Sequence, residues 1–190
     1  MRIQSLTTRP TGDEHSPYYG KYIERVPEGD VFETLESQLQ RTVELLDTFG
    51  ETGGALRYAP GKWSVKEVVG HITDTERIFT YRALCAARGE AGPLPGFDEN
   101  AYVAGAHFDA RTLNSLLGEI TVVRRATLAL FRNLGEDALV RRVIANGVPI
   151  TPRAIAWIIA GHELHHASLL RERYLPLLAE RSGCAARTHA

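Results

Sequence analysis

Apolar residues recur at spacings of three and four in four separate stretches of the chain, which is the periodicity of amphipathic helices. In the first stretch, the positions that share one helical face are Phe32, Leu35, Leu39, Val43 and Leu46. Asp30 precedes this stretch as an N-cap residue, and Gly50 follows it as a stop signal. The pattern therefore predicts a helix that begins after residue 30 and ends before residue 50.

The second stretch has the clearest start signal in the chain. Ser64 and Glu67 have the spacing of a capping box, in which each side chain satisfies a free backbone amide of the first turn. Trp63 and Val68 stand where a hydrophobic staple would pack. The predicted buried face comprises Val65, Val68, Val69, Ile72, Phe79 and Ala83. Gly89 closes the predicted helix.

A long connection, residues 90–107, separates the second helix from the third and is rich in glycine and proline. A loop of this length is unusual inside a compact domain unless it covers something, so we expect it to form a lid or wall. Asp109 is then expected to cap a third helix. Its apolar stripe includes Leu113, Leu116, Leu117, Ile120, Val123, Thr127 and Leu130.

The fourth helix follows a turn signal. Asn146 and Gly147 are flanked by β-branched residues within residues 140–150, which favours a short hairpin or an irregular turn. Thr151 and Pro152 are the expected N-cap and first helical residue. The predicted helix runs through Ile155, Ile158, Ile159, His162, His166, Leu169 and Leu170 to about Tyr174. Pro176 is expected to stop it.

The segments outside these helices set the expected domain organisation. Residues 1–29 show no helical period and are expected to form an extended arm, anchored on the domain by Tyr18, Tyr19 and Tyr22. Residues 30–175 would form the domain, and residues 176–190 a tail whose last ten residues we expect to be disordered. Four amphipathic helices with one long crossover loop predict an all-α fold, a four-helix bundle. The pattern leaves the order and handedness of helix packing open.

Composition narrows the class of protein. The 190 residues are 44% hydrophobic and 24% charged, which is enough for a sizeable core. A net charge of −1 favours neither nucleic acid nor an anionic membrane as a partner. The two cysteines, Cys85 and Cys184, are too few for a disulfide framework. With no signal peptide or long apolar span in view, we expect a cytoplasmic protein.

Three histidines lie together in the string GHELHHASLL of the fourth helix. His162 and His166 are four residues apart and therefore share a face, which is the apolar one. Two buried imidazoles without partners would each cost about 1–3 kcal/mol, whereas a metal ion would use both as ligands. His165 lies three residues after His162 and is an alternative partner for it. His166 fits the apolar stripe better.

A third ligand must come from another helix, and His71 in the middle of the second helix is the leading candidate. Asp74, one turn further on, would accept the free ring N–H of His71. The remaining histidines, in expected coil or at a loop end, are His15, His107 and His189. The alternative to a metal site is a set of histidines hydrogen-bonded in the core.

Residues 162–166 also match the H-E-x-x-H string of zinc peptidases, in which a glutamate activates water. The extended metal-protease pattern would place glycine at position 169 and histidine at position 172, where this chain has Leu169 and Glu172. A peptidase is therefore disfavoured. Glu163 stays a candidate catalytic base, because it follows His162 directly.

With these motifs in view, the chain resembles the DinB-like superfamily, which includes bacillithiol transferases and mycothiol-dependent maleylpyruvate isomerases. The matching segments are PYYGKYIERVPEGD, WSVKEVVGHITDTERIF, PLPGFDEN and ITPRAIAWIIAGHELHHASLL, so the resemblance spans about residues 17–175. It implies a four-helix bundle with one divalent metal ion. His71, His162 and His166 match the metal ligands. Zinc or nickel is expected, with iron or manganese as alternatives.

The resemblance also implies an activity. Characterised relatives use the metal to activate a low-molecular-weight thiol or act on a thiol adduct, so a thiol and a small electrophilic substrate are the expected partners. Arg77, Tyr81 and Arg82 would lie further along the His71 helix, either as contacts to an anionic substrate or as solvated surface residues. A metal-dependent hydrolase that uses bound water and a non-catalytic metal-binding protein remain alternatives.

A homodimer is expected as well. One reason is that members of the family commonly form dimers. The other is a set of apolar residues near a helix end that we expect to be exposed: Phe49, Leu56 and Tyr58.

Overall fold

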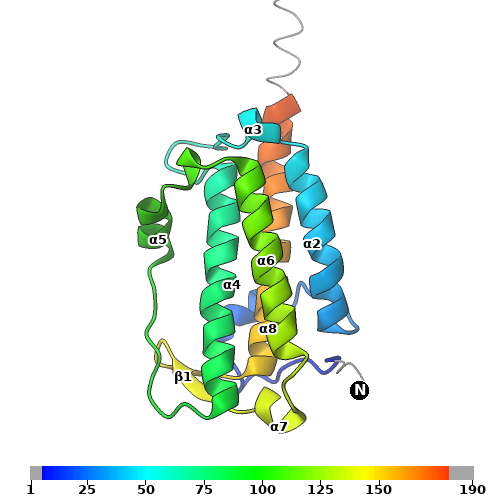
Figure 1. Ribbon diagram of the computed structural model, residues 1–190, viewed down its shortest axis with the longest axis vertical. Coiled ribbons are helices and arrows are strands. Elements are labelled where there is room, and N and C mark those ends of the chain that lie inside the picture. Colours follow the sequence, from blue (N-terminus) through cyan, green and yellow to red (C-terminus); the bar gives the residue numbers. More distant parts are fainter. Residues whose placement is uncertain (1–5, 180–190) are drawn as a thin grey trace, which may run out of the picture.

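Four long helices form a bundle in the computed structural model, which describes residues 6–179 (Figure 1). They are α2 (Val31–Asp47), α4 (Val65–Arg88), α6 (Leu113–Phe131) and α8 (Pro152–Leu169). The predicted all-α fold with four helices and a long crossover is confirmed. Within the described residues, no helix is long and apolar enough to cross a bilayer.

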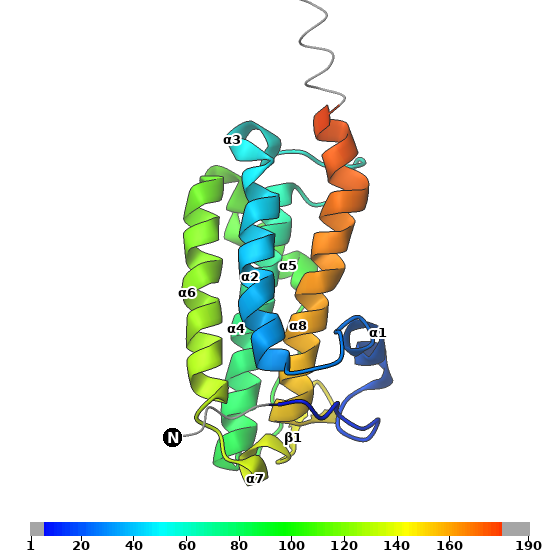
Figure 2. The same ribbon diagram turned by 90° about the vertical axis from the view of Figure 1, so that its right-hand side faces the viewer.

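The helix directions explain the long crossover. α4 and α6 run the same way along the bundle, and α2 and α8 run the opposite way (Figures 1 and 2). α2 and α4 each pack mainly against α6 and α8, so they lie diagonally across the bundle. The chain must therefore return along the full length of α4 before α6 begins. This return holds α5 (Glu99–Ala106) and η2 (Phe108–Ala110), two helices that the sequence did not indicate.

The N-terminal caps largely follow the local sequence. The Asp30 side chain accepts from the amide of Phe32, and both halves of the Ser64–Glu67 capping box are formed. The Thr151 side chain caps α8, whose first residue is Pro152. These cap predictions are confirmed.

The expected cap of the third helix was wrong, because Thr112 caps α6 and Asp109 lies one turn earlier, in η2. The Asp109 carboxylate instead accepts from Ser64 and Arg57, at 2.5 and 2.6 Å. It is a tertiary contact to the start of α4, which local spacing does not reveal.

The turn at Asn146 and Gly147 forms a hairpin of two antiparallel strands, β1 (Val143–Ala145) and β2 (Val148–Ile150). Both turn residues have positive φ, 52° and 78°, as a tight hairpin turn requires. Leu94 of the crossover forms a parallel bridge to Ala145. The hairpin, with α7 (Glu136–Leu139), therefore closes one end of the bundle and fixes the start of the crossover (Figure 1).

Pro176 does not end the last helix, contrary to expectation. The chain passes from α8 into a π-helical turn, Leu170–Tyr174, and stays helical to residue 179. A proline has no amide hydrogen and clashes with the carbonyl four residues earlier in an α-helix. We attribute its tolerance here to the wider π turn directly before it. Residues 180–190, which hold Cys184 and most of the expected tail, lie outside the described residues.

The N-terminal arm has short helices where the sequence showed no period: η1 (Pro17–Tyr19) and α1 (Gly20–Ile23). α1 lies against α8 (Figure 2). Gly161 permits this approach, because a β-carbon there would overlap the backbone of Tyr22. The Glu14 carboxylate fixes the arm further by accepting from Thr151 and Arg153. Although partial burial by itself raises the pKa of Glu14, the hydrogen bonds from Arg153, Thr11 and Thr151 lower it to about 2.

The residues expected to be exposed at a dimer surface are mostly inside the molecule. Phe49 and Leu56 are each only 2% exposed and lie in the core near α3 (Gly50–Gly53), and Tyr58 is partly buried against the same cluster. That argument for a dimer was wrong, and the homodimer stays a prediction.

A polar layer crosses the middle of the bundle and divides the apolar core in two. One apolar cluster includes Leu35 and Phe79, and the other includes Leu46 and Ile72. Between the two clusters, the four long helices contribute buried polar residues: Gln38, Thr42, His71, Thr73, Thr75, Glu76, Arg124, Thr127, His162, Glu163 and His166. Such a layer is costly unless its groups are paired, so its pairings constrain how the helices meet.

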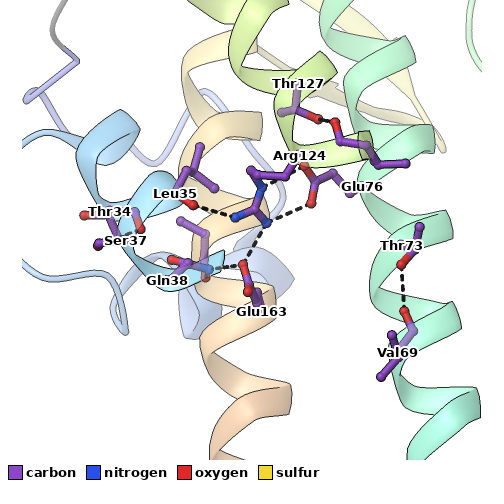
Figure 3. A network of polar contacts seen from close by, with 12 residues as sticks. Thr34, Leu35, Ser37, Gln38, Val69, Thr73, Glu76, Arg124, Thr127 and Glu163 are labelled. Carbon is purple, nitrogen blue, oxygen red and sulfur yellow. Dashed lines mark hydrogen bonds and ion pairs between the residues drawn. The ribbon is translucent and has the colours of Figure 1, made fainter. Parts of the chain in front are cut away.

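Arg124 on α6 is the centre of these pairings and is fully buried (Figure 3). Its guanidinium donates to both carboxylate oxygens of Glu76 on α4, each at 2.8 Å, and to Glu163 on α8 at 2.7 Å. A further bond of 2.8 Å reaches the carbonyl oxygen of Leu35 on α2. Burial alone would lower the pKa of Arg124, but the two carboxylates raise it above the ordinary value. One side chain thus binds all three other helices.

Replacement of Arg124 should destabilise the protein strongly. Arg124→Met would leave Glu76 and Glu163 buried without a cation, so we expect a loss of about 3–5 kcal/mol in the free energy of unfolding. Urea unfolding followed by circular dichroism measures this loss. Arg125→Met is the matched control, because Arg125 is exposed on the same helix and should contribute less than about 1 kcal/mol. Equal losses in both variants would contradict the central role of Arg124.

Candidate metal centre

Three histidine side chains meet within the polar layer. His71 lies on α4, and His162 and His166 lie one turn apart on α8. The Nε2 atom of His162 is 3.0 Å from that of His71 and 3.1 Å from that of His166. Within residues 6–179, these are the side chains brought together as a possible metal-binding group. The sequence predicted this set of three, and the structure makes them converge.

The geometry follows from helix packing. The spacing of four places His162 and His166 on one face of α8, and α8 packs against α4 through that side. Aromatic rings then limit how the imidazoles turn: Trp63 lies 4.6 Å from the His71 ring, and Tyr22 lies 5.3 Å from the His162 ring, between centroids. Trp63 thus contributes to the site as well as to the start of α4.

Burial keeps the three imidazoles neutral. Each is less than 8% exposed. Burial, with a smaller contribution from His165, lowers the pKa of His71 to about 4. Burial and the neighbouring histidines hold the pKa values of His162 and His166 well below the ordinary 6.5. Neutral imidazole is the form that binds a metal ion, so the site carries its ligands ready for one.

The nitrogen positions fit a divalent ion. Bonds of about 2.0–2.1 Å in tetrahedral geometry separate ligand nitrogens by roughly 3.3–3.4 Å. The Nε2 atom of His162 lies 3.0 and 3.1 Å from those of His71 and His166, and the three ligand atoms all lie within 4.8 Å of one another. Three imidazoles also leave positions open for a substrate. Three Nε2 atoms facing one another can form only limited hydrogen bonds among themselves, because two neutral ring nitrogens bond only where one of them carries the proton. A divalent metal ion accounts for this convergence better than hydrogen bonding in the core.

The ring of His165 lies outside this group, against Tyr22 at 5.6 Å between centroids. The structure therefore favours His166 over His165 as the partner of His162. Asp74 does not support His71 as expected, because its carboxylate pairs with Arg77 at 3.2 Å. The residue near the Nδ1 atom of His71 is Thr75, whose hydroxyl lies at 3.5 Å.

Glu163, expected beside the metal as a base, points to other helices. Its carboxylate accepts from Arg124 on α6 and from Gln38 on α2 (Figure 3). The neighbours His162 and Glu163 thus face different sides of α8 and belong to different parts of the polar layer. The contacts give Glu163 a structural role and do not place it at the histidine rings.

A cavity of about 310 Å³ reaches His162 from the surface. The arm, α4, the crossover, the hairpin and α8 all line it, through Ser16, Tyr18, Tyr19, Tyr22, Thr75, Phe79, Arg82, Phe97, Glu99, Asn146, Val148, Ile158 and His162. The crossover therefore forms one wall, as its length suggested. Burial and the neighbouring Tyr18 raise the pKa of Tyr22, which keeps its hydroxyl protonated at neutral pH.

The structure separates the three side chains expected near an anionic substrate. Arg77 is paired with Asp74 and Glu119, and Tyr81 is 57% exposed. Arg82 lines the cavity and is only 3% exposed, so it is not the solvated surface residue that the alternative predicted.

The structural roles of Arg124, Glu76 and Gln38 were not predicted, although the sequence holds a signal for the first two. Arg124 follows Ile120 by four residues and Glu76 follows Ile72 by four, so both charges stand on the apolar stripe of their helix. A charge at such a position is rarely buried without a partner. Two charged residues of opposite sign, on the apolar stripes of different helices, therefore indicate a buried ion pair.

Together, the fold and the site define an all-α bundle protein with a candidate centre for a divalent metal. Comparison with known families agrees. The chain belongs to the DinB superfamily, whose sequence model matches residues 34–170. No sequence among the curated proteins matches significantly.

Solved structures with this fold include the two that follow. One is YfiT from Bacillus subtilis, described as a probable metal-dependent hydrolase with an unusual four-helix bundle topology. It has 20% identity and a TM-score of 0.64, and the match covers 93% of this chain and 94% of that one. The other is the mycothiol-dependent maleylpyruvate isomerase, with 15% identity and a TM-score of 0.62. That match covers 73% of this chain and 58% of the isomerase.

Metal binding should depend on His166 and not on His165. We expect His166→Ala to lose stoichiometric zinc after dialysis, because two imidazoles hold a divalent ion weakly. His165→Ala is the matched control and should retain most of the zinc, since its ring faces Tyr22. Elemental analysis of the purified variants measures the metal, and circular dichroism checks that both remain folded. Zinc retained in His166→Ala but lost in His165→Ala would reverse the assignment.

The stability of the metal-free protein should fall as pH decreases from about 6.5 toward 4. In that range the unfolded chain binds protons on histidines that the folded protein keeps neutral, since the pKa of His71 is lowered from 6.5 to about 4. Each such histidine contributes at most about 1.4 kcal/mol per pH unit to the slope of the unfolding free energy against pH. Urea unfolding after chelation, from pH 7.5 to 5, measures the slope. His71→Gln should have a smaller slope, and an unchanged slope would contradict the neutral state of His71.

Proposed function

We propose that the chain binds one divalent metal ion through His71, His162 and His166 and catalyses a reaction between a low-molecular-weight thiol and a small electrophile. The observation that carries this proposal is the convergence of three neutral imidazoles where a cavity of about 310 Å³ reaches His162. Zinc or nickel is the proposed metal, with iron or manganese as alternatives. A cytoplasmic location and a homodimer remain part of the proposal.

The proposal depends on what the ion supplies: it lowers the pKa of a thiol or water that binds it. An ordinary thiol has a pKa near 8.5 and water one of about 15.7, so a thiol needs much less help to ionise at neutral pH. The buried carboxylates Glu76 and Glu163 are both bound to Arg124 and are therefore weak bases, which leaves the exposed Glu99 as the carboxylate of the cavity lining. The contacts therefore suit a thiol better than water.

The cavity contributes binding and exclusion of water. Its aromatic wall includes Tyr19, Phe79 and Phe97, which would pack on an apolar part of a small substrate. The protonated hydroxyl of Tyr22 remains a hydrogen-bond donor beside the His162 ring. The cavity volume is at the small end of the range for ligand pockets, so the substrate should be small.

A metal-dependent hydrolase is the second candidate. The likeness to YfiT, which extends over almost the whole of both chains, is the observation that favours it. Such an enzyme would use water in place of the thiol and would need a base. A non-catalytic metal-binding protein would show neither activity.

The deciding experiment is a paired turnover screen on metal-loaded protein. We expect saturable conjugation of a thiol, such as cysteine, with a small electrophile such as monochlorobimane, and loss of at least about tenfold in His71→Ala because a ligand is removed. Hydrolysis of nitrophenyl esters without thiol is measured in parallel. Ester turnover without thiol turnover would replace the proposal with the hydrolase, and metal content with neither activity would refute an enzymatic role.

A further inference from the structure

A buried guanidinium forms part of the cavity wall. Arg82 lies on α4, eleven residues after His71, so three helical turns bring it back to the same face. Thr75 and Phe79 lie between them on that face and also line the cavity. The cavity therefore extends along α4 from the region of His162 to Arg82. The rise from Thr75 to Arg82 is about 10 Å, the length of a small organic molecule.

Arg82 has few partners for a buried cation. It donates to the carbonyl oxygen of Pro95 at 2.8 Å and also hydrogen-bonds to the side chain of Tyr19, which lines the same cavity. Its guanidinium lies 5.3 Å from the Phe79 ring centroid and 5.8 Å from that of Phe97. Across residues 6–179, it forms no ion pair with a carboxylate. Arg124, by contrast, is buried with two carboxylates. A guanidinium has five N–H donors, so Arg82 keeps donors for a ligand in the cavity beyond those bound to Pro95 and Tyr19.

We propose that Arg82 determines substrate specificity by binding a carboxylate group of the substrate. A guanidinium and a carboxylate form paired, charge-assisted hydrogen bonds, which are strongest where water is excluded. Among the lining residues in the described part of the chain, Arg82 is the one with a permanent positive charge, and a single positive charge matches a carboxylate better than a phosphate dianion. The bound molecule would place its carboxylate at Arg82 and its other end near His162. The second half of this inference rests on the proposed function.

Glu99 allows a second test, in which removing a negative charge should have the opposite effect on binding. It is exposed in the first turn of α5 and belongs to the same cavity lining. Its negative charge would repel a carboxylate, so its removal should strengthen binding while removal of Arg82 weakens it. A purely structural role for Arg82, holding Pro95 of the crossover, would produce no such opposition.

The experiment compares phenylacetate with its neutral amide, phenylacetamide, as probes in NMR titrations of the full-length protein. Both have an aromatic ring for the cavity wall, and only phenylacetate has the charge. We expect wild type to prefer phenylacetate about tenfold or more. Arg82→Gln should bind it about 10–100-fold more weakly, and Arg82→Lys should be intermediate. Glu99→Gln should bind it several-fold more tightly.

Arg88→Gln is the matched control, because it removes the same charge from an exposed position on the same helix and should bind like wild type. Equal binding of both probes by wild type would overturn the inference even if Arg82→Gln fails to fold. Equal phenylacetate affinity in Arg82→Gln and wild type, or tighter binding of inorganic phosphate, would also overturn it. Titrations before and after chelation separate the two proposals: dependence on Arg82 should persist without metal, whatever the outcome for turnover.

Discussion

The pairing of one buried guanidinium with two carboxylates governs how the bundle assembles. Arg124 on α6 reaches Glu76 on α4, Glu163 on α8 and a backbone carbonyl of α2 (Figure 3). If α4, α6 or α8 slid by one turn, a charge would be left unpaired in the core, at a cost of several kcal/mol. The same register places His71 opposite His162, so the candidate metal centre depends on an interaction that does not touch it.

α8 links the two halves of the polar layer. His162 and Glu163 are neighbours in the chain, yet about 100° of helical rotation separates their side chains. One therefore faces α4 and the arm, and the other faces α2 and α6. Because the Glu163 carboxylate is held by Arg124, it stays on the side of α8 away from the histidine rings.

The topology also creates the cavity. α4 and α6 run in the same direction, so the chain must return along the outside of the bundle, and this return supplies Phe97 and Glu99 to the cavity wall. The N-terminal arm closes another side, where Gly161 lets α1 approach α8. Solved structures with the same fold have different described activities, so function must be argued from these lining residues rather than from the bundle.

By itself, the sequence determined the helices and most of their caps, since periodicity and capping depend on residues within a turn or two of one another, as at Ser64. The shared face of His162 and His166 follows from the same local geometry. The tertiary structure decided three further features. His162 and His166 converge with His71, Glu163 pairs with Arg124, and Arg82 is buried. These outcomes depend on which helices become neighbours and at what height, and that is set by pairings between side chains far apart in the chain.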